Sequence, residues 1–294
     1  MILRPLRDTA EDAEIVRLVA AASFHDSHSE GDPADEPTWP ERPEREDELN
    51  RWFARTDPDG CSVAVDDRDP DGKALGVALS SRREGTWGLS LLVVVPEAQG
   101  KGVGRALLEH AVAYGADCPR GIICGSRDPR AARAYRAAGF TLHPTMRFGG
   151  VVDPARLPAP DGAVVEGGAR HQELMDGVDR LRRGGARGPD HAELLRHCRL
   201  LVADDGAGSG YVYVDGGKVV TLSATSEQVA ARLLTAALRS MEPGVRARLA
   251  DVTAEQEWAV DVALAARLSP RNAGYLCLRG MRPPVPFVPS GAFL

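Results

Sequence analysis

The alternation of apolar and polar residues divides residues 1–150 into short strands and amphipathic helices. An apolar, mostly β-branched run from Leu89 to Val95 is typical of a buried strand, which Pro96 ends by removing a backbone donor. The same pattern predicts further strands at 1–7, 61–65, 74–81, 121–125 and 140–148, and helices at 8–24, 44–55, 103–114 and from about 129. Strands and helices are thus mixed along the chain, and we predict an α/β (α+β) fold.

The second half of the chain repeats this order of elements. Residues 151–168 are rich in proline and glycine and predict a linker. Beyond it we expect helices at 171–183, 190–198, 227–241 and 254–268, and strands at 200–203, 210–214, 218–224, 245–252 and 274–280. The predicted domains are therefore residues 1–150 and 169–294.

Length and composition agree with two soluble domains. A chain of 294 residues can bury two cores, and 43% hydrophobic with 27% charged residues is ordinary for a globular protein. The whole formal net charge of −6 falls in residues 1–150, so nothing indicates nucleic-acid binding. No apolar run is long enough to span a membrane, and residues 1–7 predict a strand, not a signal peptide. We expect a cytoplasmic protein.

The five cysteines do not indicate a covalent framework. They are odd in number and widely spaced, and no Cys-x-x-Cys occurs. We therefore predict reduced thiols, without a zinc site or any other metal.

The strongest candidate for chemistry is the stretch from Gln99 to Arg105. Its three glycines let the backbone turn tightly and come close to a ligand. The first amides of the following helix lack partners within the helix and favour an anion, so we predict a phosphate site. A dinucleotide fingerprint would need glycine at Arg105, and the glycines of a Walker loop are also missing.

A second motif runs from Asp128 to Phe140 and contains Tyr135. Pro129 suits a first helical turn, and Gly139 suits a helix end. Tyr135 is either a proton donor, whose phenol has an ordinary pKa near ~10, or a ring packed in the core.

Together the two motifs resemble the GNAT superfamily of acyl-coenzyme A dependent N-acyltransferases. The glycine loop matches its Q/R-x-x-G-x-G/A pattern, and Asp128–Phe140 matches its Asn-x-x-Ala-x-x-x-Tyr-x-x-x-Gly-Phe pattern, with Asp128 in place of the usual Asn. The resemblance implies two tandem GNAT folds, each a mixed, mostly antiparallel twisted sheet flanked by helices. It implies acetyl-CoA as co-substrate and Tyr135 as the acid that protonates the leaving thiolate. The residues expected at the cofactor are Leu92, Val93, Val94, Gln99, Gly100, Lys101, Gly102, Val103, Gly104, Arg105 and Asp128.

The second half lacks this loop. When Val103–Leu108 is aligned with Val229–Leu234, the three loop glycines correspond to Ser226, Gln228 and Ala230. We therefore predict a degenerate GNAT-like domain that no longer binds coenzyme A well. The ending 279–294 resembles the tails of actinobacterial tandem GNAT proteins, and its proline spacing predicts an extended run over the partner half.

The sequence does not identify the residue that acts as general base. Family members often carry a glutamate on the strand before the loop or on the strand after the cofactor helix, but residues 87–95 hold no carboxylate and the second position falls near Ile123. The alternatives are Ser90 acting through a water, a carboxylate of the acidic segment 25–48, or the Leu294 carboxylate.

The acidic segment has two interpretations. It either steers a cationic amine or is a solvated insertion, and its His25, Asp26 and His28 form either a metal site or, as we prefer, a polar surface cluster.

These observations predict an enzyme that moves an acetyl group from acetyl-CoA to a primary amine of a small molecule by direct transfer in a ternary complex. The alternative is a non-catalytic acetyl-CoA sensing protein. A third hypothesis is an antibiotic-resistance or mycothiol-pathway acetyltransferase. A monomer and a homodimer are both compatible with the sequence.

Overall fold

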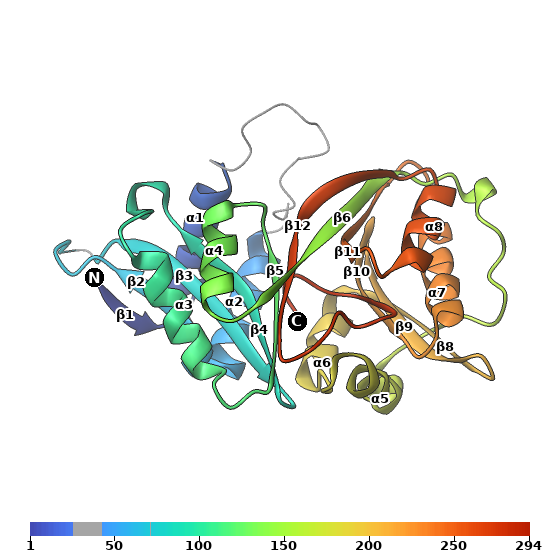
Figure 1. Cartoon of the computed structure of the whole chain (residues 1–294), viewed down its shortest axis with the longest axis horizontal. Coiled ribbons are helices and arrows are strands. Elements are labelled where there is room, and N and C mark those ends of the chain that lie inside the picture. Colours follow the sequence, from blue (N-terminus) through green and yellow to red (C-terminus); the bar gives the residue numbers. More distant parts are fainter. Residues whose placement is uncertain (26–42, 71) are drawn as a thin grey trace. The chain divides into compact units, whose positions relative to one another are not determined.

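The computed structural model describes residues 1–25, 43–70 and 72–294. The chain divides into two compact units (Figure 1). Unit 1 comprises residues 1–82 and 87–118, and unit 2 comprises residues 83–86 and 119–294.

Unit 1 contains a four-stranded sheet in the order β1-β2-β3-β4. These strands are β1 (Ile2–Pro5), β2 (Cys61–Val65), β3 (Ala74–Arg83) and β4 (Thr86–Val94). β2 runs antiparallel to both β1 and β3. Only Glu84 and Gly85 connect β3 to β4, so these two strands also run antiparallel.

Three helices accompany this sheet: α1 (Ala10–His25), α2 (Pro43–Thr56) and α3 (Val103–Tyr114). Their apolar sides bury Val16, Phe53 and Leu107. The start of α1 is fixed by Asp12, whose fully buried carboxylate binds the guanidinium groups of Arg4 and Arg7. These two ion pairs hold α1 against the end of β1.

Unit 2 contains the remaining strands in the order β5-β12-β6-β11-β10-β9-β8-β7. Their bounds are β5 (Arg120–Gly125), β6 (Thr141–Val151), β7 (Val165–Glu166), β8 (Arg199–Asp205), β9 (Gly208–Asp215), β10 (Lys218–Ala224), β11 (Arg246–Thr253) and β12 (Ser269–Arg279). All neighbours in this order are antiparallel except β10 and β11, which are parallel. A short strand, β13 (Phe287–Val288), pairs with β10 outside this order.

The centre of this sheet exchanges strands between the two sequence halves. β12, from the second half, pairs with β5 and β6 of the first, while β6 pairs with β11 of the second half. Because these pairings cross residue 150, the compact units do not follow the predicted domains 1–150 and 169–294. The last strands of the two stretches, β6 and β12, each pair with strands of the other stretch.

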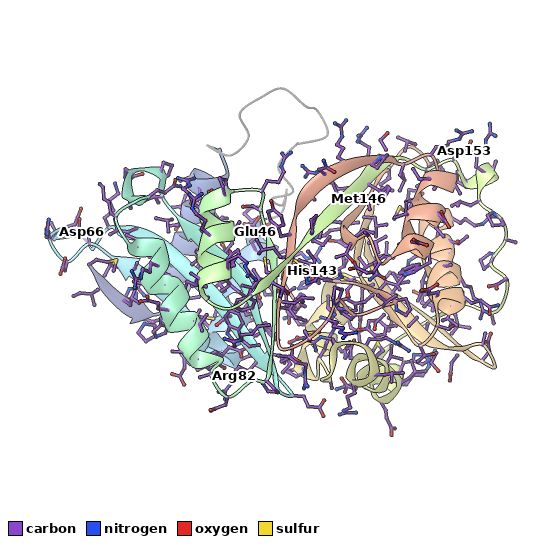
Figure 2. All side chains as sticks on the ribbon, in the orientation of Figure 1. Glu46, Asp66, Arg82, His143, Met146 and Asp153 are labelled. Carbon is purple, nitrogen blue, oxygen red and sulfur yellow. The ribbon has the colours of Figure 1, made fainter. Side chains whose placement is uncertain are left out.

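Five helices complete unit 2: α4 (Pro129–Ala137), α5 (Gln172–Arg183), α6 (Pro189–His197), α7 (Glu227–Arg239) and α8 (Glu257–Ala265). One core cluster joins α7 and α8 to β8–β11, and it includes the fully buried Leu222, Leu233 and Leu249. Met146 of β6, labelled in Figure 2, packs against this cluster. The core of the second sequence half therefore includes a strand from the first half.

The order of elements is the same in both halves. From β1 to β6 and from β7 to β12 the chain forms a strand, two helices, three strands, a helix, a strand, a helix and a strand. The predicted mixed α/β fold with a mostly antiparallel sheet is confirmed. The two-residue strands β7 and β13 were missed because so short a pairing leaves no hydrophobic period in the sequence.

All five cysteines are free thiols, as predicted. Among the described residues, no helix has both the length and the apolar character needed to cross a membrane.

Candidate functional site

The loop between β4 and α3 ends in an uncapped helix N-terminus. A short 3-10 turn, η3 (Pro96–Ala98), follows β4, and Gly102 occupies the N-cap position of α3. Because the N-cap residue is a glycine, it makes no side-chain capping hydrogen bond to this helix start. The first intrahelical bond runs from the Ala106 amide to the Gly102 carbonyl, so the amides of Val103, Gly104 and Arg105 precede it. Such a helix start attracts an anion.

Two glycines give this loop its shape. Gly100 and Gly102 have φ values of 72° and 87°, in the left-handed region that favours glycine. A Cβ built on either residue would meet no atom within 4 Å, so the backbone borders open space at both positions. Both residues are exposed, as is Lys101 between them. The loop therefore presents backbone amides and one lysine, a combination suited to a phosphate group.

The remaining predicted loop residues have structural partners. The Gln99 side chain donates a hydrogen bond to the Val94 carbonyl, which ties the loop to the end of β4. Ser23 of α1 donates to the same carbonyl through its hydroxyl group. Arg105 forms an exposed ion pair with Glu109 one turn along α3, and Val103 is buried. Gln99 thus shapes the loop, and Val103 has only its backbone to offer a ligand.

The predicted pantetheine contacts lie at the end of β4. Leu92 and Val94 are half-buried and Val93 is buried, while Ser90 is half-buried two residues earlier on the strand. Gly104 in the first turn of α3 packs close to this strand, because a Cβ there would lie 3.4 Å from Val94 Cγ2. The assignment of these residues to the cofactor stays a prediction.

Tyr135 lies on α4 in unit 2 and is 7% exposed. A Cβ built on Gly125 would lie 3.1 Å from Tyr135 Cε2, so the ring covers the end of β5. Burial, with a smaller effect of Cys277 and Asp128, raises the pKa of the Tyr135 phenol above its ordinary value. The phenol therefore keeps its proton at neutral pH, as a proton donor must.

Asp128 caps α4. Its carboxylate accepts hydrogen bonds from the Arg130 amide and from the Arg130 guanidinium. The bond from Arg130 holds the pKa of Asp128 below its ordinary value. The side chain that replaces the family's asparagine is thus engaged in starting the helix.

The structure describes only some of the positions considered for the general base. Most of the acidic segment, including Asp26 and His28, lies outside the described residues, as does the side chain of His25. Leu294 is buried, and its main-chain oxygen accepts a hydrogen bond from the buried Arg183. Ile123 of β5 is buried and apolar.

The second half has a closed helix start where the first half has an open one. Ser226 is the N-cap of α7, and its hydroxyl accepts a hydrogen bond from the Val229 amide. This capping occupies a donor that a phosphate would need.

The chain also occupies the end of β10, which corresponds to the end of β4. Phe287 and Val288 of β13 pair with Ser223 and Leu222. The tail, predicted to run over the partner half, thus pairs with a strand of its own half, although Leu294 packs with Ile122 of β5.

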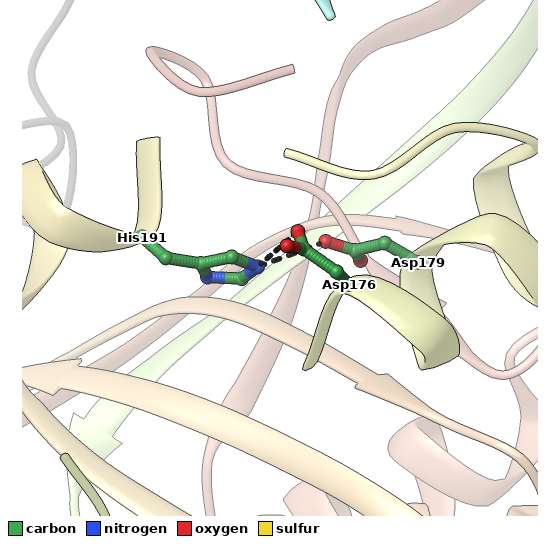
Figure 3. Close-up of side chains that lie close together, drawn as sticks. All are labelled: Asp176, Asp179 and His191. Atoms are coloured by element: carbon green, nitrogen blue, oxygen red, sulfur yellow. Dashed lines mark ion pairs between the residues drawn. The ribbon is translucent and has the colours of Figure 1, made fainter. Parts of the chain in front are cut away.

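A buried polar cluster fills the space between α5, α6 and β9. Asp176, Asp179 and His191 point toward one another (Figure 3), and His191 Nε2 lies 3.3 Å from an Asp179 oxygen and 3.5 Å from an Asp176 oxygen. These ligand atoms all lie within 4.8 Å of one another, a spacing that metal sites can have.

The charges around this cluster disfavour a metal ion. Arg187 is fully buried and lies 3.3 Å from Asp179, and Tyr211 donates a hydrogen bond of 2.6 Å to the other Asp179 oxygen. Arg83 pairs with Asp190 at 2.5 Å, and Arg183 is buried nearby. Three guanidinium groups already balance three carboxylates, so a divalent cation would add uncompensated buried charge. We interpret the cluster as a structural network that joins α5 and α6 to the sheet.

Sequence reasoning missed this cluster and one further carboxylate. Asp179 and His191 lie on different helices with no motif between them. Burial and, after it, the Asp251 carboxylate of β11 raise the pKa of the Cys124 thiol on β5. Local patterns contain no signal for either pairing, because strand exchange and helix packing bring the partners together.

Residues 22–140 match the model of the acetyltransferase (GNAT) family. No curated protein matches the chain. Among solved structures, a candidate acetyltransferase from Pyrococcus horikoshii has a TM-score of 0.77 at 16% identity, covering 100% of this chain and 95% of that one.

Two further structures resemble the whole chain. A GCN5-related N-acetyltransferase from Sphaerobacter thermophilus has a TM-score of 0.58 at 16% identity, covering 96% of this chain and 97% of that one. A tandem GNAT protein from the clavulanic acid biosynthesis pathway has a TM-score of 0.56 at 14% identity, covering 96% and 99%. Residues 22–140 thus match the acetyltransferase (GNAT) family, and the chain as a whole shares the fold of these three structures.

Proposed function

We propose that the protein transfers an acetyl group from acetyl-CoA to a primary amine of a small molecule, directly and in a ternary complex. One observation carries the proposal: the start of α3 is uncapped and follows two glycines in left-handed conformation. Several converging amides at a positive helix end can hold a pyrophosphate without a metal ion. Lys101 adds a positive charge to the same loop.

In this proposal the end of β4 pairs with the pantetheine arm. A strand edge can hold an extended amide chain by main-chain hydrogen bonds, and it leaves donors that polarise the thioester carbonyl. Tyr135 protonates the leaving thiolate, which avoids expelling a charged group from a buried site. Its raised pKa keeps the phenol protonated until the thiolate forms, and it also makes the phenol a weaker acid than a solvent-exposed tyrosine.

The primary test measures thiol release from acetyl-CoA with a panel of aliphatic amines, diamines, aminoglycosides and amino acids. Amine-dependent thiol release with a matching acetylated product supports the transferase. Tight binding of acetyl-CoA without amine-dependent release would replace it with an acetyl-CoA sensor.

The Tyr135→Phe variant tests the acid. We expect turnover to fall by about 100-fold or more, because general acid catalysis contributes about 10² to 10⁴ to rates, while acetyl-CoA affinity changes less than about threefold. Tyr213→Phe is the control, since Tyr213 is buried in the network around His191. Unchanged turnover in Tyr135→Phe would make Tyr135 a packing residue.

A further inference from the structure

An open groove of about 520 Å³ lies in unit 2 between α5 and the ends of the neighbouring strands. This volume is in the range of small-molecule sites. The helix side of the groove comes from the 3-10 turn η5 (Ala169–His171) and from α5, which follows it directly. The residues on this side are spaced three and four apart, so they share one helix face. They are Arg170, Glu173, Leu174, Gly177 and Val178.

The strand side of the groove is polar. It consists of Asp204 near the end of β8, Ser209 near the start of β9 and Thr225 just after β10. The Ser209 hydroxyl donates a hydrogen bond of 2.5 Å to the Asp204 carboxylate, and the Ser209 amide donates one of 2.9 Å to the Thr225 hydroxyl. These bonds fix the Asp204 carboxylate beside two hydroxyl groups before any ligand binds.

Gly177 keeps the helix side of the groove open. It lies in the interior of α5, where glycine is among the least favourable residues. A Cβ built on Gly177 would meet no atom within 4 Å, so packing does not require glycine at this position. A larger side chain here would instead occupy the groove. The unfavourable residue is therefore explained by the space that it leaves for a ligand.

Three charged side chains line this groove without a charged partner. Among residues 1–25, 43–70 and 72–294, Arg170, Glu173 and Asp204 take part in no ion pair. Arg170 donates only to a main-chain carbonyl. The neighbouring Asp205, by contrast, pairs with Arg232 at 2.5 Å. Charges of both signs therefore border the groove and are left to solvent or to a ligand.

We propose that this groove binds a zwitterionic small molecule of the amino-acid class. Its ammonium group lies between the carboxylates of Glu173 and Asp204. Its carboxylate meets the guanidinium group of Arg170, which can bind both oxygens at once. Its hydrocarbon part covers Leu174 and Val178, the apolar residues of the helix side. The second sequence half thus has a ligand other than coenzyme A, and this binding does not depend on acetyl transfer.

A zwitterion fits the lining better than a ligand of one sign. An amine without a carboxylate would leave the charge of Arg170 unmatched. A carboxylic acid without an amine would face the two carboxylates of Glu173 and Asp204, and such like-charge contacts disfavour binding. The two charged groups of the ligand should therefore both contribute to affinity.

Calorimetric titration of the full chain tests the class of ligand. The probes are L-leucine, L-methionine and L-phenylalanine, each compared with the amine that lacks its carboxylate and the acid that lacks its ammonium group. We expect at least one amino acid to bind, and the loss of either charged group to weaken binding at least about tenfold. Absence of binding by all three amino acids at millimolar concentration, or equal binding of an analogue, overturns the proposal.

The Gly177→Leu variant tests the location. Leucine fills the open space at this position and is a better helix former than glycine, so Tm should not fall. Amino-acid affinity should fall at least about tenfold, while acetyl-CoA affinity stays within about twofold. The matched control is Gln172→Leu, which adds the same side chain at an exposed position of α5 outside the groove. If Gly177→Leu binds the amino acid as wild type does, the ligand lies elsewhere and the proposal fails.

The Arg170→Gln variant tests the orientation of the ligand. It should weaken binding of the amino acid at least about fivefold but leave binding of the matching amine unchanged, because only the amino acid has a carboxylate to lose its partner. Asp204→Asn should weaken both. Asp261→Asn, which changes an exposed carboxylate on α8, should weaken neither. Equal losses for amino acid and amine in Arg170→Gln would contradict a contact between Arg170 and the ligand carboxylate.

Discussion

The two sequence halves build the same elements in the same order, yet their corresponding helices α3 and α7 start differently. At the start of α3 stands Gly102, without a side chain, whereas Ser226 caps the start of α7. The end of β4 is a candidate partner for the cofactor, whereas β13 pairs with the end of β10. In the second half the chain satisfies its own hydrogen-bonding groups at both places. Two copies of one order of elements can thus differ in whether a helix start and a strand end are satisfied by the chain itself.

The halves differ also in the space between their first two helices and the sheet. In the second half, Arg183, Arg187 and Asp179 are fully buried there with His191. In the first half, α1 is fixed by Asp12 with the partly exposed Arg4 and Arg7. The second half therefore has a fully buried ionic anchor in this region, where the first half has a partly exposed one.

The largest effect is expected from Asp179→Asn, which tests the anchor. Asparagine keeps the shape but leaves Arg187 without its charged partner, and breaking a buried pair costs about 3–5 kcal/mol of unfolding free energy. Urea unfolding measures this loss. The control Asp261→Asn should change stability by less than about 0.5 kcal/mol, because that carboxylate is exposed. A loss below about 1 kcal/mol for Asp179→Asn would show that the network is not an anchor.

The pH dependence of unfolding free energy gives a second test with the Asp179→Asn variant, and the direction of the Asp179 pKa shift fixes the expected trend. Burial alone would raise the pKa of Asp179, but Arg187 and His191 hold it below its ordinary value. A carboxylate with a lowered folded-state pKa stabilises the protein above its unfolded value of about 4, and this stabilisation is lost as the pH falls through the folded-state value. The stability difference between wild type and Asp179→Asn should therefore be constant above about pH 5 and shrink below about pH 4.

Gly102→Val closes the open helix start of the first half. Valine is strained at a φ of 87°, and its side chain would project into the open space before the amides. We expect acetyl-CoA affinity to fall at least about 100-fold, which is about 3 kcal/mol. Calorimetric titration measures the affinity.

Gly244→Val controls for backbone strain in this experiment. Gly244 has a φ of 84° and equally open surroundings, but it lies between α7 and β11. It should lose stability without losing acetyl-CoA affinity. If Gly102→Val binds acetyl-CoA as wild type does, the loop is not the phosphate site.

Ser226→Ala removes the cap from the second half. Loss of a serine N-cap costs about 1 kcal/mol, and for a chain of this size we expect Tm to fall by about 2–4 °C. The stoichiometry should stay at one acetyl-CoA per chain, because β13 still pairs with β10. A second bound acetyl-CoA in this variant would show that the cap alone excludes the ligand.

The smallest effect is expected for Lys101→Ala. Lys101 is exposed, so its attraction to a phosphate is screened by water and salt. Acetyl-CoA affinity should fall only about two- to fivefold at low salt, and the difference should vanish above about 0.5 M salt. A loss as large as that of Gly102→Val would mean that the lysine, and not the amides, dominates binding.

The amino-acid sequence by itself determined the elements and the loop. β-branched runs, helix caps and glycines act over a few neighbouring residues, so β4, the loop and α3 were predicted close to their observed bounds. The contrast between the loop glycines and Ser226 was likewise visible in the sequence. The acceptor and the oligomeric state are matters of pockets and surfaces, and no local pattern specified them.

Only the tertiary structure decided how the halves share strands and which distant groups meet. β12 pairs with β5 and β13 pairs with β10, because main-chain hydrogen bonds form with any strand that folding brings alongside. Main-chain hydrogen bonds do not depend on the identity of the side chains, so the sequence contains no pattern that predicts which distant strands will pair. The sequence therefore specified the start of α3 at Gly102, and the packing of strands specified which strands of the two halves lie side by side.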